Sequence, residues 1–444
     1  MSWAMDRDPT WEFAAQADSN HFIPPQPFSL DVWEITAANP DGAWEHQKPG
    51  IPTYLEAPPT GLRIILAPLD LPQKATKAAF LALFKAIGIP QAFIRERLQS
   101  VSHSFGSVSN QDKHCVWFHF LCKHIEIAED APTVVHRGPL RGSDETLVAH
   151  QADYTWRRSG FFLFADGDKR TVTLCCFGAE GKVEERLRQF LKRPGRRQAL
   201  DEPYVLLDVV LDGLYSEVDN NVWNMNAVFG ALERRLLVAS TSRGQASTSK
   251  EVTFAELHNV AKHMIHLREA VESCLHLTDS IIRRAEESPQ TQSQLGKQPE
   301  RISQTRQEVR DLLLYRQSLF RSTKLRLESL NQRVANSIGL SFNLLTVADS
   351  SILIQHSSVM KIMAAITTIF LPTTAVAAIM GSQLFATSFD DENWTVRPTP
   401  LFGVLWAVAV PLTIVVLIFA ALWHWRTHRT DEKEKGLARR ITGL

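Results

Sequence analysis

The sequence predicts a membrane protein of the α+β class, with a cytosolic α/β domain, a bundle of very long helices that forms a stalk, and two transmembrane helices near the C-terminus. Three observations lead to this prediction. Two uncharged, apolar runs lie near the C-terminus, the segment before them has uninterrupted helical periodicity, and an earlier region alternates between strand-like and helix-like stretches.

Length and composition limit the possibilities. The chain has 444 residues, which is room for two or three structural units, and its formal net charge is zero. A neutral chain has no general attraction to nucleic acid, so we expect no nucleic-acid partner. The five cysteines form no CxxC pair, and their odd number fits a reducing compartment better than a disulfide framework. The N-terminus lacks a basic segment followed by an apolar core, so no secretory signal peptide is expected.

Residues 1–60 are rich in proline and are predicted to form a mostly irregular arm, because proline disrupts helix interiors and central strands. The arm is too aromatic for a simple linker, and part of it is expected to pack on the domain that follows. Its aromatic residues include Trp3, Trp11, Phe13, Phe22, Phe28, Trp33 and Trp44.

Residues 61–200 are predicted to form the cytosolic α/β domain, with an antiparallel component. Four segments rich in β-branched and aromatic residues are typical of strands, and they read LRIILAPL, HCVWFHFL, GFFLFAD and TVTLCCF. Asp166-Gly167-Asp168, between the last two, fits a hairpin turn. Three segments have helical spacing, and they read KAAFLALFKAIGI, PQAFIRERLQSV and GKVEERLRQFLKR.

One predicted strand carries a cluster of possible metal ligands: His114, Cys115, His119, Cys122 and His124. On a strand, residues 114, 122 and 124 share one face, and the other two residues lie on the opposite face. The set cannot converge on one ion without a bulge. Structural roles are therefore favoured over a zinc site.

Residues 201–360 are predicted to form long helices that make a funnel or stalk. The first begins near Pro203, a second is predicted from Phe254 to Glu287, and a third runs from Ile302 without another proline until Pro372. Apolar residues of the first helix recur every three or four positions, at Leu206, Val210, Leu214, Val218, Val222, Met225, Phe229, Leu232 and Leu236. Those of the third include Val309, Leu312, Leu319, Leu327, Leu330, Val334, Ile338, Leu345 and Ile352. Periodicity of this length is typical of a coiled coil or an oligomeric stalk.

Acidic residues cluster near the start of the first long helix, at Asp208, Asp212, Glu217 and Asp219. They are interpreted as a hydrated helix face in preference to a metal site.

Residues 361–386 and 401–425 are predicted to be transmembrane helices, joined by an outside loop at 387–400. Each contains the roughly 20 predominantly apolar residues that a helix needs to cross a bilayer core. They read IMAAITTIFLPTTAVAAIMGSQLFATSF and PTPLFGVLWAVAVPLTIVVLIFAALWHW, with a few flanking residues included. The lipid bilayer is therefore an expected partner.

The charges beside the spans predict the orientation. Basic residues follow the second span in the tail, 426–444, whereas the loop holds Asp390, Asp391 and Glu392 against Arg397 alone. The positive-inside rule then places both termini in the cytosol. The acidic residues are expected to concentrate cations at short range on the outside, and the alternative is a solvated loop that only sets the topology.

The first span contains Thr368-Ile369-Phe370-Leu371-Pro372, and Gly381-Ser382-Gln383 begins nine residues after Pro372. This pattern resembles the CorA family of divalent-cation (Mg²⁺) transporters, in which a TIFLP-like stretch opens the pore helix and Gly-Met-Asn closes it at the same spacing. The segment PYVLLDVVLDGLY also looks like the start of the family's first long cytosolic helix. The resemblance covers about residues 60 to 425 and is divergent, because Gly-Ser-Gln stands in place of Gly-Met-Asn.

The resemblance implies a homopentamer in which five first spans line a pore and five second spans surround them. It places Gln383 at the outer mouth, Thr374 and Leu371 further down, and Met363 and Met360 near the cytosolic entrance. Counted on a helix, these residues fall within a stripe of moderate width. Thr374 would offer a ring of hydroxyls, and the Leu and Met rings would form an apolar constriction that gates by dewetting.

The altered signature bears on selectivity. Gln383 keeps the carboxamide of the family's Asn and adds a methylene, Ser382 replaces a Met, and Gly381 is retained. Cation permeation is therefore expected, with the choice of ion left open. The resemblance also places a regulatory cation site near Asp349, for which an exposed stalk aspartate is an equal alternative.

The chain carries no Walker loop, GxSxG, HExxH or dinucleotide fingerprint, so neither an enzyme nor a cofactor is expected. Mg²⁺ or another divalent cation is expected as the substrate and as a possible regulator. The predicted function is passive divalent-cation transport through a pentameric pore. Two alternatives remain: a simple membrane anchor, and a non-conducting or regulatory homologue that acts as a membrane-tethered interaction protein.

Overall fold

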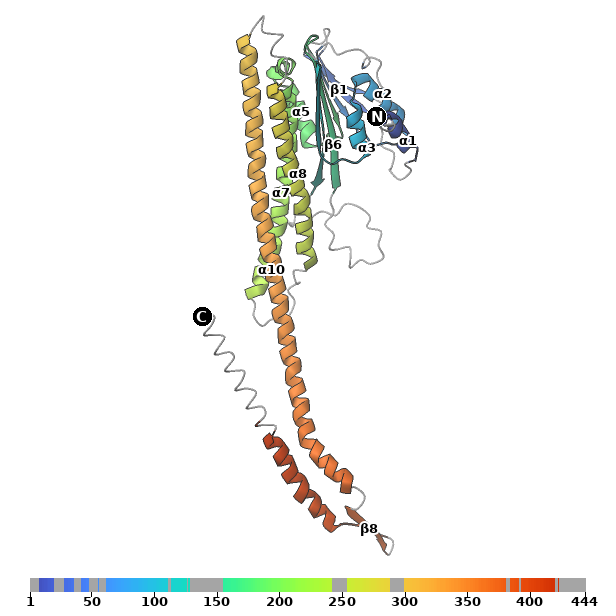
Figure 1. Ribbon diagram of the computed structural model, residues 1–444, viewed down its shortest axis with the longest axis vertical. Helices are drawn as coiled ribbons and strands as arrows, with labels where there is room; N and C mark the ends of the chain where they lie inside the picture. The colour runs from blue at the N-terminus through green and yellow to red at the C-terminus, as the bar shows by residue number, and fades with distance from the viewer. Residues whose placement is uncertain are drawn as a thin grey trace, which may run out of the picture. The chain divides into compact units, whose positions relative to one another are not determined.

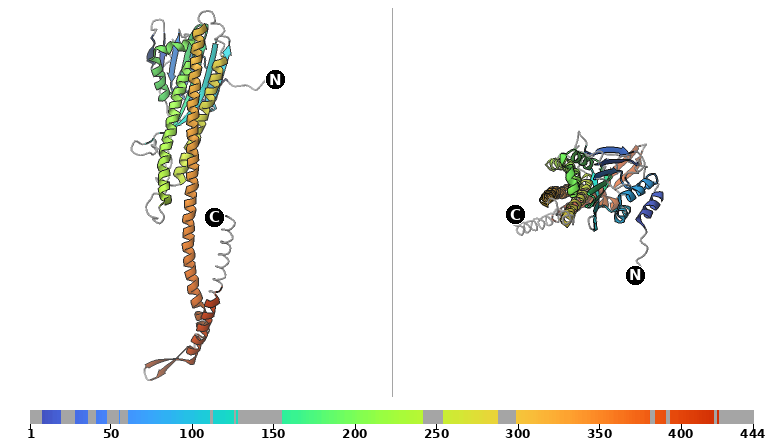
Figure 2. Two further views of the ribbon diagram at one scale, coloured as in Figure 1. Left: turned by 90° about the vertical axis from the view of Figure 1, so that its left-hand side faces the viewer. Right: turned by 90° about the horizontal axis from the view of Figure 1, so that it is seen from above.

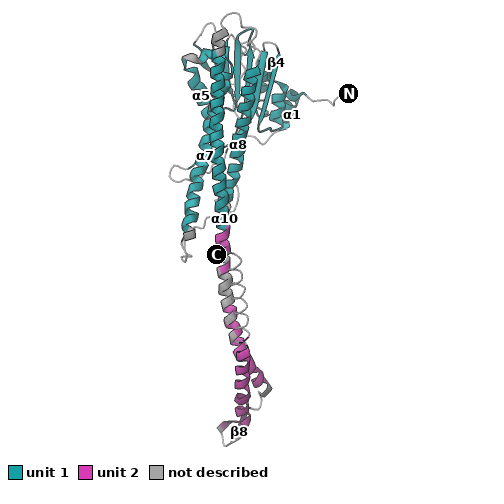
Figure 3. Ribbon diagram, turned by 60° about the vertical axis from the view of Figure 1, so that its left-hand side comes forward, with its two compact units in different colours: residues 1–341 teal, residues 342–444 magenta. Residues whose placement is uncertain are grey.

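The structure is a computed structural model that describes residues 8–19, 28–35, 41–47, 55, 61–110, 113–125, 127, 155–241, 254–287, 299–380, 384–390, 393–419 and 422. The chain divides into two compact units, residues 1–341 and 342–444 (Figure 3). In the first unit, helices cover both faces of a sheet (Figure 1). The predicted α/β domain and long helices are therefore confirmed.

The sheet of the first unit has seven strands in the order β2-β1-β3-β7-β6-β5-β4. β3 and β7 pair in parallel and all other neighbours are antiparallel, which confirms the predicted antiparallel component. The strands are β1 (Leu30–Glu34), β2 (Ala43–Gln47), β3 (Leu62–Ala67), β4 (Ser104–Asn110), β5 (Lys113–His124), β6 (Thr155–Asp166) and β7 (Thr171–Phe177).

The proline-rich arm contributes regular structure to this unit. It supplies α1 (Pro9–Ser19) together with β1 and β2, which extend the sheet beyond β3. Phe13 and Phe28 pack with Phe80 and Phe84 on one face of the sheet, and their rings meet edge to face. The expectation of a mostly irregular arm missed these elements, because two five-residue strands between prolines give a weak sequence signal.

Alternation along the strands divides the core into two layers. On β6, Phe161 belongs to the layer under the long helices and the next residue, Phe162, belongs to the layer under α2 and α3. The covering helices of the first unit are α1, α2 (Lys77–Ile87) and α3 (Gln91–Leu98) on one face, and α5 (Lys182–Leu191), α6 (Gln198–Asp201), α7 (Tyr204–Thr241), α8 (Phe254–Glu287) and the first part of α10 (Pro299–Met380) on the other. A 3₁₀ turn, η2 (Pro194–Arg197), precedes α6.

The three long helices α7, α8 and α10 gather on one side of the sheet (Figure 2). All nine apolar positions predicted for α7, from Leu206 to Leu236, are buried, so the helical spacing is confirmed. On α10 the prediction was wrong in part. Leu312 and Leu345 are exposed, whereas Leu313 and Phe320, which were not among the predicted positions, are buried.

The buried face of α10 follows a heptad pattern that apolar residues alone do not reveal. Positions 313, 320, 327, 334 and 341 form one buried series, spaced seven apart. A second series, three residues later in each heptad, holds Arg316, Thr323, Leu330 and Ser337. Because polar residues occupy three of the four positions in the second series, a count of leucines predicts the wrong phase.

The second unit contains the end of α10, a hairpin of β8 (Phe385–Asp390) and β9 (Asn393–Pro398), and the C-terminal helix Pro400–Phe419. That helix is long and apolar enough to cross a membrane, and it is the one such helix among the described residues. The other apolar segment, Ile362–Ala378 at the end of α10, is shorter. The prediction that the first span continues to residue 386 was wrong at its end, because α10 ends at Met380 and β8 begins at Phe385.

Candidate pore helix and its ion-pair frame

The end of α10 carries four of the predicted pore residues on one face. At about 100° per residue, Met360, Met363, Leu371 and Thr374 fall within an arc of roughly 80°. All four side chains are exposed in the single chain. The helical count does not extend to Gln383, because α10 ends at Met380. The four described residues form this stripe, and the position of Gln383 relative to it remains a prediction.

The opposite face of α10 packs on the C-terminal helix. Pro372 and Val376 are buried, and Val376 lies in a small apolar cluster with Leu405 and Ala409. Counted around the helix, Pro372 and Val376 lie about 140–180° from the middle of the exposed stripe. The helix pair therefore leaves the predicted pore face uncovered by its own chain.

The threonine hydroxyls of this face donate to the helix backbone. Thr374 Oγ1 lies 2.9 Å from the carbonyl oxygen of Phe370 and 3.0 Å from that of Leu371. A hydroxyl that donates its proton inward keeps its lone pairs for an acceptor role on the outer side, as contact with a cation or its hydration shell requires.

Thr367 belongs to the same face, although the sequence prediction did not include it. It lies seven residues before Thr374, is exposed, and donates to the carbonyl oxygen of Met363 at 2.8 Å. Its signal was available in the sequence, because positions 360, 363, 367, 371 and 374 follow a three- and four-residue spacing.

Several predicted site residues lie outside the part of the chain that the structure describes. These are Gly381, Ser382, Gln383, Asp391 and Glu392. Two more are described only by their backbone, since Asp390 ends β8 and Asp349 lies within α10. Their assigned roles remain predictions.

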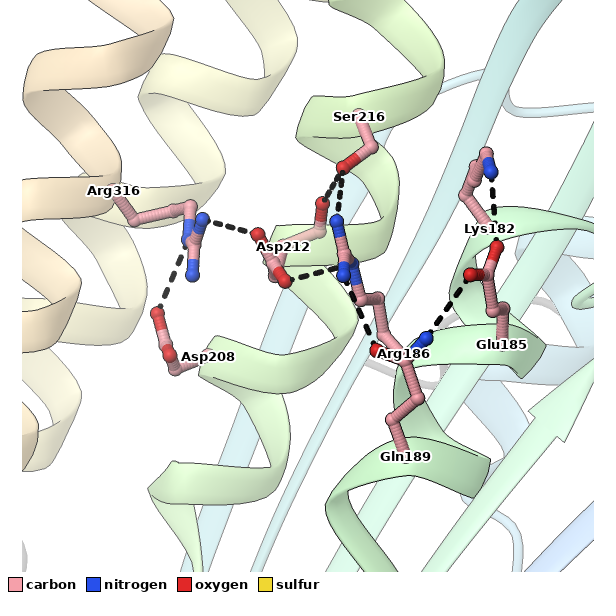
Figure 4. Close-up of polar contacts among 8 residues, drawn as sticks. All are labelled: Lys182, Glu185, Arg186, Gln189, Asp208, Asp212, Ser216 and Arg316. Carbon is pink, nitrogen blue, oxygen red and sulfur yellow. Dashed lines mark hydrogen bonds and ion pairs between the residues drawn. The ribbon is translucent and has the colours of Figure 1, made fainter.

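In the first unit, an ion-pair network joins α5, α7 and α10 (Figure 4). Arg316 on α10 bonds to both Asp208 and Asp212 on α7, with Nε 3.3 Å from Asp208 Oδ1. Asp212 also forms an ion pair with Arg186 of α5, with Asp212 Oδ2 3.0 Å from Arg186 Nε. Ser216 donates to the backbone carbonyl of Asp212 at 2.9 Å. The carboxylates of Asp208 and Asp212 thus bind a guanidinium group. A metal site would instead need these carboxylate oxygens to be free to bind the ion.

The same pairing repeats along α7 and α10, and we call the whole set the arginine ladder: Asp208, Asp212, Asp219, Asn226 and Glu233 of α7 with Arg316, Arg326 and Arg333 of α10. Asp212, Asp219, Asn226 and Glu233 are spaced seven apart, and so are Arg326 and Arg333. Arg326 lies 2.6 Å from Asp219, and its guanidinium sits 4.4 Å from the ring centre of Trp223. The ladder fixes the register of the two helices, because a shift by one residue would break every rung.

Burial governs the electrostatics of the ladder. Desolvation raises the pKa of Asp208, and the positive charge of Arg316 opposes this rise. Glu217 is also buried; its pKa is raised by burial and opposed by Arg157, which lies 3.0 Å away. The interpretation of these acids as a hydrated helix face was wrong for Asp208 and Glu217, since only 6% and 7% of their surfaces are exposed.

The histidines and cysteines of β5 face two different layers. His114 stacks on Tyr204 of α7, with ring centres 5.8 Å apart, while His119 Nε2 lies 3.1 Å from the carbonyl oxygen of Phe93 on α3. The strand is regular throughout, so the predicted division between faces is confirmed. Within the described residues, no group of three or more His, Cys, Asp or Glu is arranged to hold a metal ion.

No protein-family model matches the sequence. A curated relative, the Notoamide biosynthesis cluster protein M′ of Aspergillus versicolor, is 29% identical over 169 residues. The match covers 36% of this chain and 35% of that protein, so it spans about a third of each.

Three solved structures align with 70% or more of this chain. The CorA magnesium transporter from Methanocaldococcus jannaschii aligns over 89% of this chain and 98% of its own, at 13% identity and a TM-score of 0.44. The full-length CmaX protein aligns over 92% and 100%, at 13% identity and a TM-score of 0.43. The cytoplasmic domain of ZntB from Vibrio parahaemolyticus aligns over 70% and 98%, at 10% identity and a TM-score of 0.35.

Proposed function

We propose that this chain is a divergent CorA-family transporter that conducts divalent cations, Mg²⁺ among them, through a pore lined by the end of α10 in a homopentamer. The observation that carries the proposal is the division of α10 into two faces. One face packs on the C-terminal helix through Val376, and the other presents Met360, Met363, Leu371 and Thr374 to the outside of the chain.

The proposed pore has an ion-contacting part and a gating part. Rings of Thr367 and Thr374 hydroxyls offer oxygen lone pairs to a hydrated cation, and Mg²⁺ keeps much of its hydration shell when it binds. Rings of Leu371, Met363 and Met360 form an apolar constriction that closes by dewetting. Gln383 supplies the carboxamide of the outer mouth.

The driving force is the membrane potential and the ion gradient. A divalent cation gains about 4.6 kcal/mol when it moves inward through 100 mV, twice the value for one charge. Passive conduction of this kind requires no nucleotide hydrolysis, and both termini lie in the cytosol.

Complementation of Mg²⁺ uptake tests the proposal. The full chain is expressed in cells that lack their own uptake systems, and growth and ⁶³Ni²⁺ or Mg²⁺ influx are measured. We expect uptake by the wild type and a roughly tenfold loss in Thr374→Val, which corresponds to about 1.4 kcal/mol at one ring of hydroxyls. Thr413→Val is the matched control, because Thr413 makes the same bond to a backbone carbonyl, at 2.8 Å from Ala409, on the other helix.

A second candidate function follows from the altered signature at Gly381-Ser382-Gln383. In this alternative the chain is a non-conducting or regulatory homologue that tethers its cytosolic unit to the membrane. Absence of Mg²⁺, Co²⁺ and Ni²⁺ influx in expressed and correctly inserted wild type would establish it. Influx in Gln383→Asn alone would mean that the same pore is present but silent.

A further inference from the structure

The segment between α10 and the C-terminal helix forms a regular β-hairpin, where the sequence predicted only a polar loop. In its register Phe385 pairs with Pro398, Thr387 with Val396, and Asp390 with Asn393. Cross-strand partners share a face, and so do residues two apart on one strand. One face therefore carries Phe385, Thr387, Val396 and Pro398, and it also carries Trp394, two residues before Val396.

The two faces of the hairpin differ in chemistry. The face just described is aromatic and aliphatic apart from one threonine, and we call it the aromatic face. The opposite face carries Ala386, Thr395 and Arg397. Phe385, Trp394 and Val396 are 51%, 71% and 59% exposed, so the chain itself leaves the aromatic face largely uncovered.

The aromatic face continues the apolar surface of the C-terminal helix. The ring of Phe385 contacts the ring of Phe402, with centres 5.5 Å apart. The backbone N–H of Thr399 donates to the carbonyl oxygen of Leu384 at 3.1 Å and ties the base of the hairpin to the start of the helix. Trp406 and Val410, further along that helix, are exposed as well. An environment that covers the helix therefore reaches the hairpin at Phe385.

We propose that the β8–β9 hairpin is a membrane-interface element, whose aromatic face lies in the boundary between lipid headgroups and acyl chains while Arg397 and Thr395 face the headgroups and water. This proposal rests on the membrane topology of the proposed function. Trp and Phe are suited to that depth because their rings are apolar and the indole N–H can reach water.

The backbone fixes the depth at which the hairpin can lie. A two-stranded sheet has an open edge on each strand, and its unpaired N–H and C=O groups cannot enter the hydrocarbon region. The boundary region supplies water and headgroups for those edges and apolar chains for the rings. The bilayer core would leave the backbone groups of the hairpin edges without hydrogen-bond partners, and water alone would leave the aromatic face exposed. Neither environment suits the hairpin as well as the boundary region.

Site-specific fluorescence quenching on the full chain in phosphatidylcholine–phosphatidylglycerol vesicles tests the proposal. An environment-sensitive label is attached to Val396→Cys on the aromatic face and to Arg397→Cys on the opposite face. Label bound by the unsubstituted chain is subtracted, and four of the five native cysteines are buried. Quenching is measured with lipids spin-labelled near the headgroup, and with iodide on both sides of the membrane.

We expect the Val396→Cys label to be quenched at least twofold more than the Arg397→Cys label by the spin-labelled lipid, with the reverse order for iodide. Equal iodide access at both positions would overturn the proposal in favour of a solvated hairpin. Protection of the Val396→Cys label from both quenchers would overturn it in favour of cover by another copy of the chain.

A third label separates failure of this proposal from failure of the topology. Ile418→Cys lies at an exposed position of the C-terminal helix. If lipid quenches this label and the hairpin is solvated, only the interface proposal fails. If lipid does not quench it, the membrane topology fails, and the proposed transport function fails with it.

Discussion

Replacement of Arg316 by leucine tests whether the arginine ladder stabilises the first unit. Arg316 occupies a heptad core position of α10 that Leu330 occupies two heptads later, so a leucine fits the helix-packing pattern. The change leaves Asp208 buried without its guanidinium, whereas Asp212 keeps Arg186 at 3.0 Å. The cost therefore comes from one stranded carboxylate. Loss of one partner of a buried pair costs about 3–5 kcal/mol, and we expect about 3 kcal/mol because Asp208 can take up a proton.

The destabilisation caused by Arg316→Leu is expected to depend on pH. Burial already raises the pKa of Asp208, and loss of the Arg316 charge raises it further. When the pKa of a carboxyl group is higher in the folded state than in the unfolded state, the free energy of unfolding falls as the pH rises through the folded-state pKa. The destabilisation by Arg316→Leu is thus expected to be larger at pH 8 than at pH 5. Urea unfolding of the detergent-solubilised chain, followed by tryptophan fluorescence, measures it.

Two further variants decide the interpretation. Asp208→Asn combined with Arg316→Leu removes the stranded charge and is expected to recover about 2 kcal/mol of the loss. Arg310→Leu, also on α10, breaks an exposed pair with Glu286 of α8 and is expected to cost no more than about 0.5 kcal/mol. If Arg316→Leu costs as little as Arg310→Leu, or if its cost does not change with pH, the ladder does not stabilise the unit in the way described.

Two other outcomes follow from the first unit. Burial, and secondarily the charge of Arg284, lowers the pKa of His114 to about 4. The folded state therefore loses about 3 kcal/mol relative to the unfolded state as the pH falls from 6.5 to 4. His114→Phe is expected to remove this loss from a plot of unfolding free energy against pH, and the control His258→Phe, at an exposed site, is not. A Cβ at Gly213 would lie 2.4 Å from the backbone of α5, so Gly213→Ala is expected to destabilise the unit by about 1–3 kcal/mol. Gly230 lies on the same helix as Gly213 and has open space around it, so Gly230→Ala is expected to stabilise the unit by up to about 1 kcal/mol. Urea unfolding measures both changes.

Elements with a strong, repeated sequence signal were predicted correctly. The nine buried apolar positions of α7 and the strands β3, β5, β6 and β7 follow from periodicity and from β-branched and aromatic content. In a long periodic segment, a few residues that do not fit the pattern do not change the prediction. The same reasoning located both ends of α8 and the start of α10 to within a few residues.

Elements whose stability depends on distant partners were not predictable in this way. β1 is a five-residue strand that becomes central only because β3 and β2 pair on either side of it. Arg316 reads as a surface residue until Asp208 and Asp212 are placed opposite it. Each strand of the β8–β9 hairpin has six residues and lies next to an apolar run. The high apolar content of that run makes the alternating pattern of a short strand hard to recognise in the sequence. For β1 and Arg316 the deciding contact lies far away in sequence.

The exposed surface at the end of α10 is not chemically uniform, and this asymmetry separates a pore helix from an anchor. Around the helix, at about 100° per residue, three sectors can be distinguished. One sector, at Pro372 and Val376, packs on the C-terminal helix. A second holds the exposed aliphatic residues Ile362, Ile366 and Ile369.

The third sector holds Met360, Met363, Thr367, Leu371 and Thr374, so it combines thioether, aliphatic and hydroxyl groups. Thr367 and Thr374 lie in this sector, whereas the hydroxyl of Thr368 lies outside it. An anchor surrounded by lipid gains nothing from gathering hydroxyls in one sector, because acyl chains contact every uncovered side alike. A helix that faces lipid on one side and copies of itself around water on another does gain from it, since isoleucines suit the lipid and hydroxyl oxygens suit a hydrated ion. The arrangement therefore favours the conducting function over the anchor.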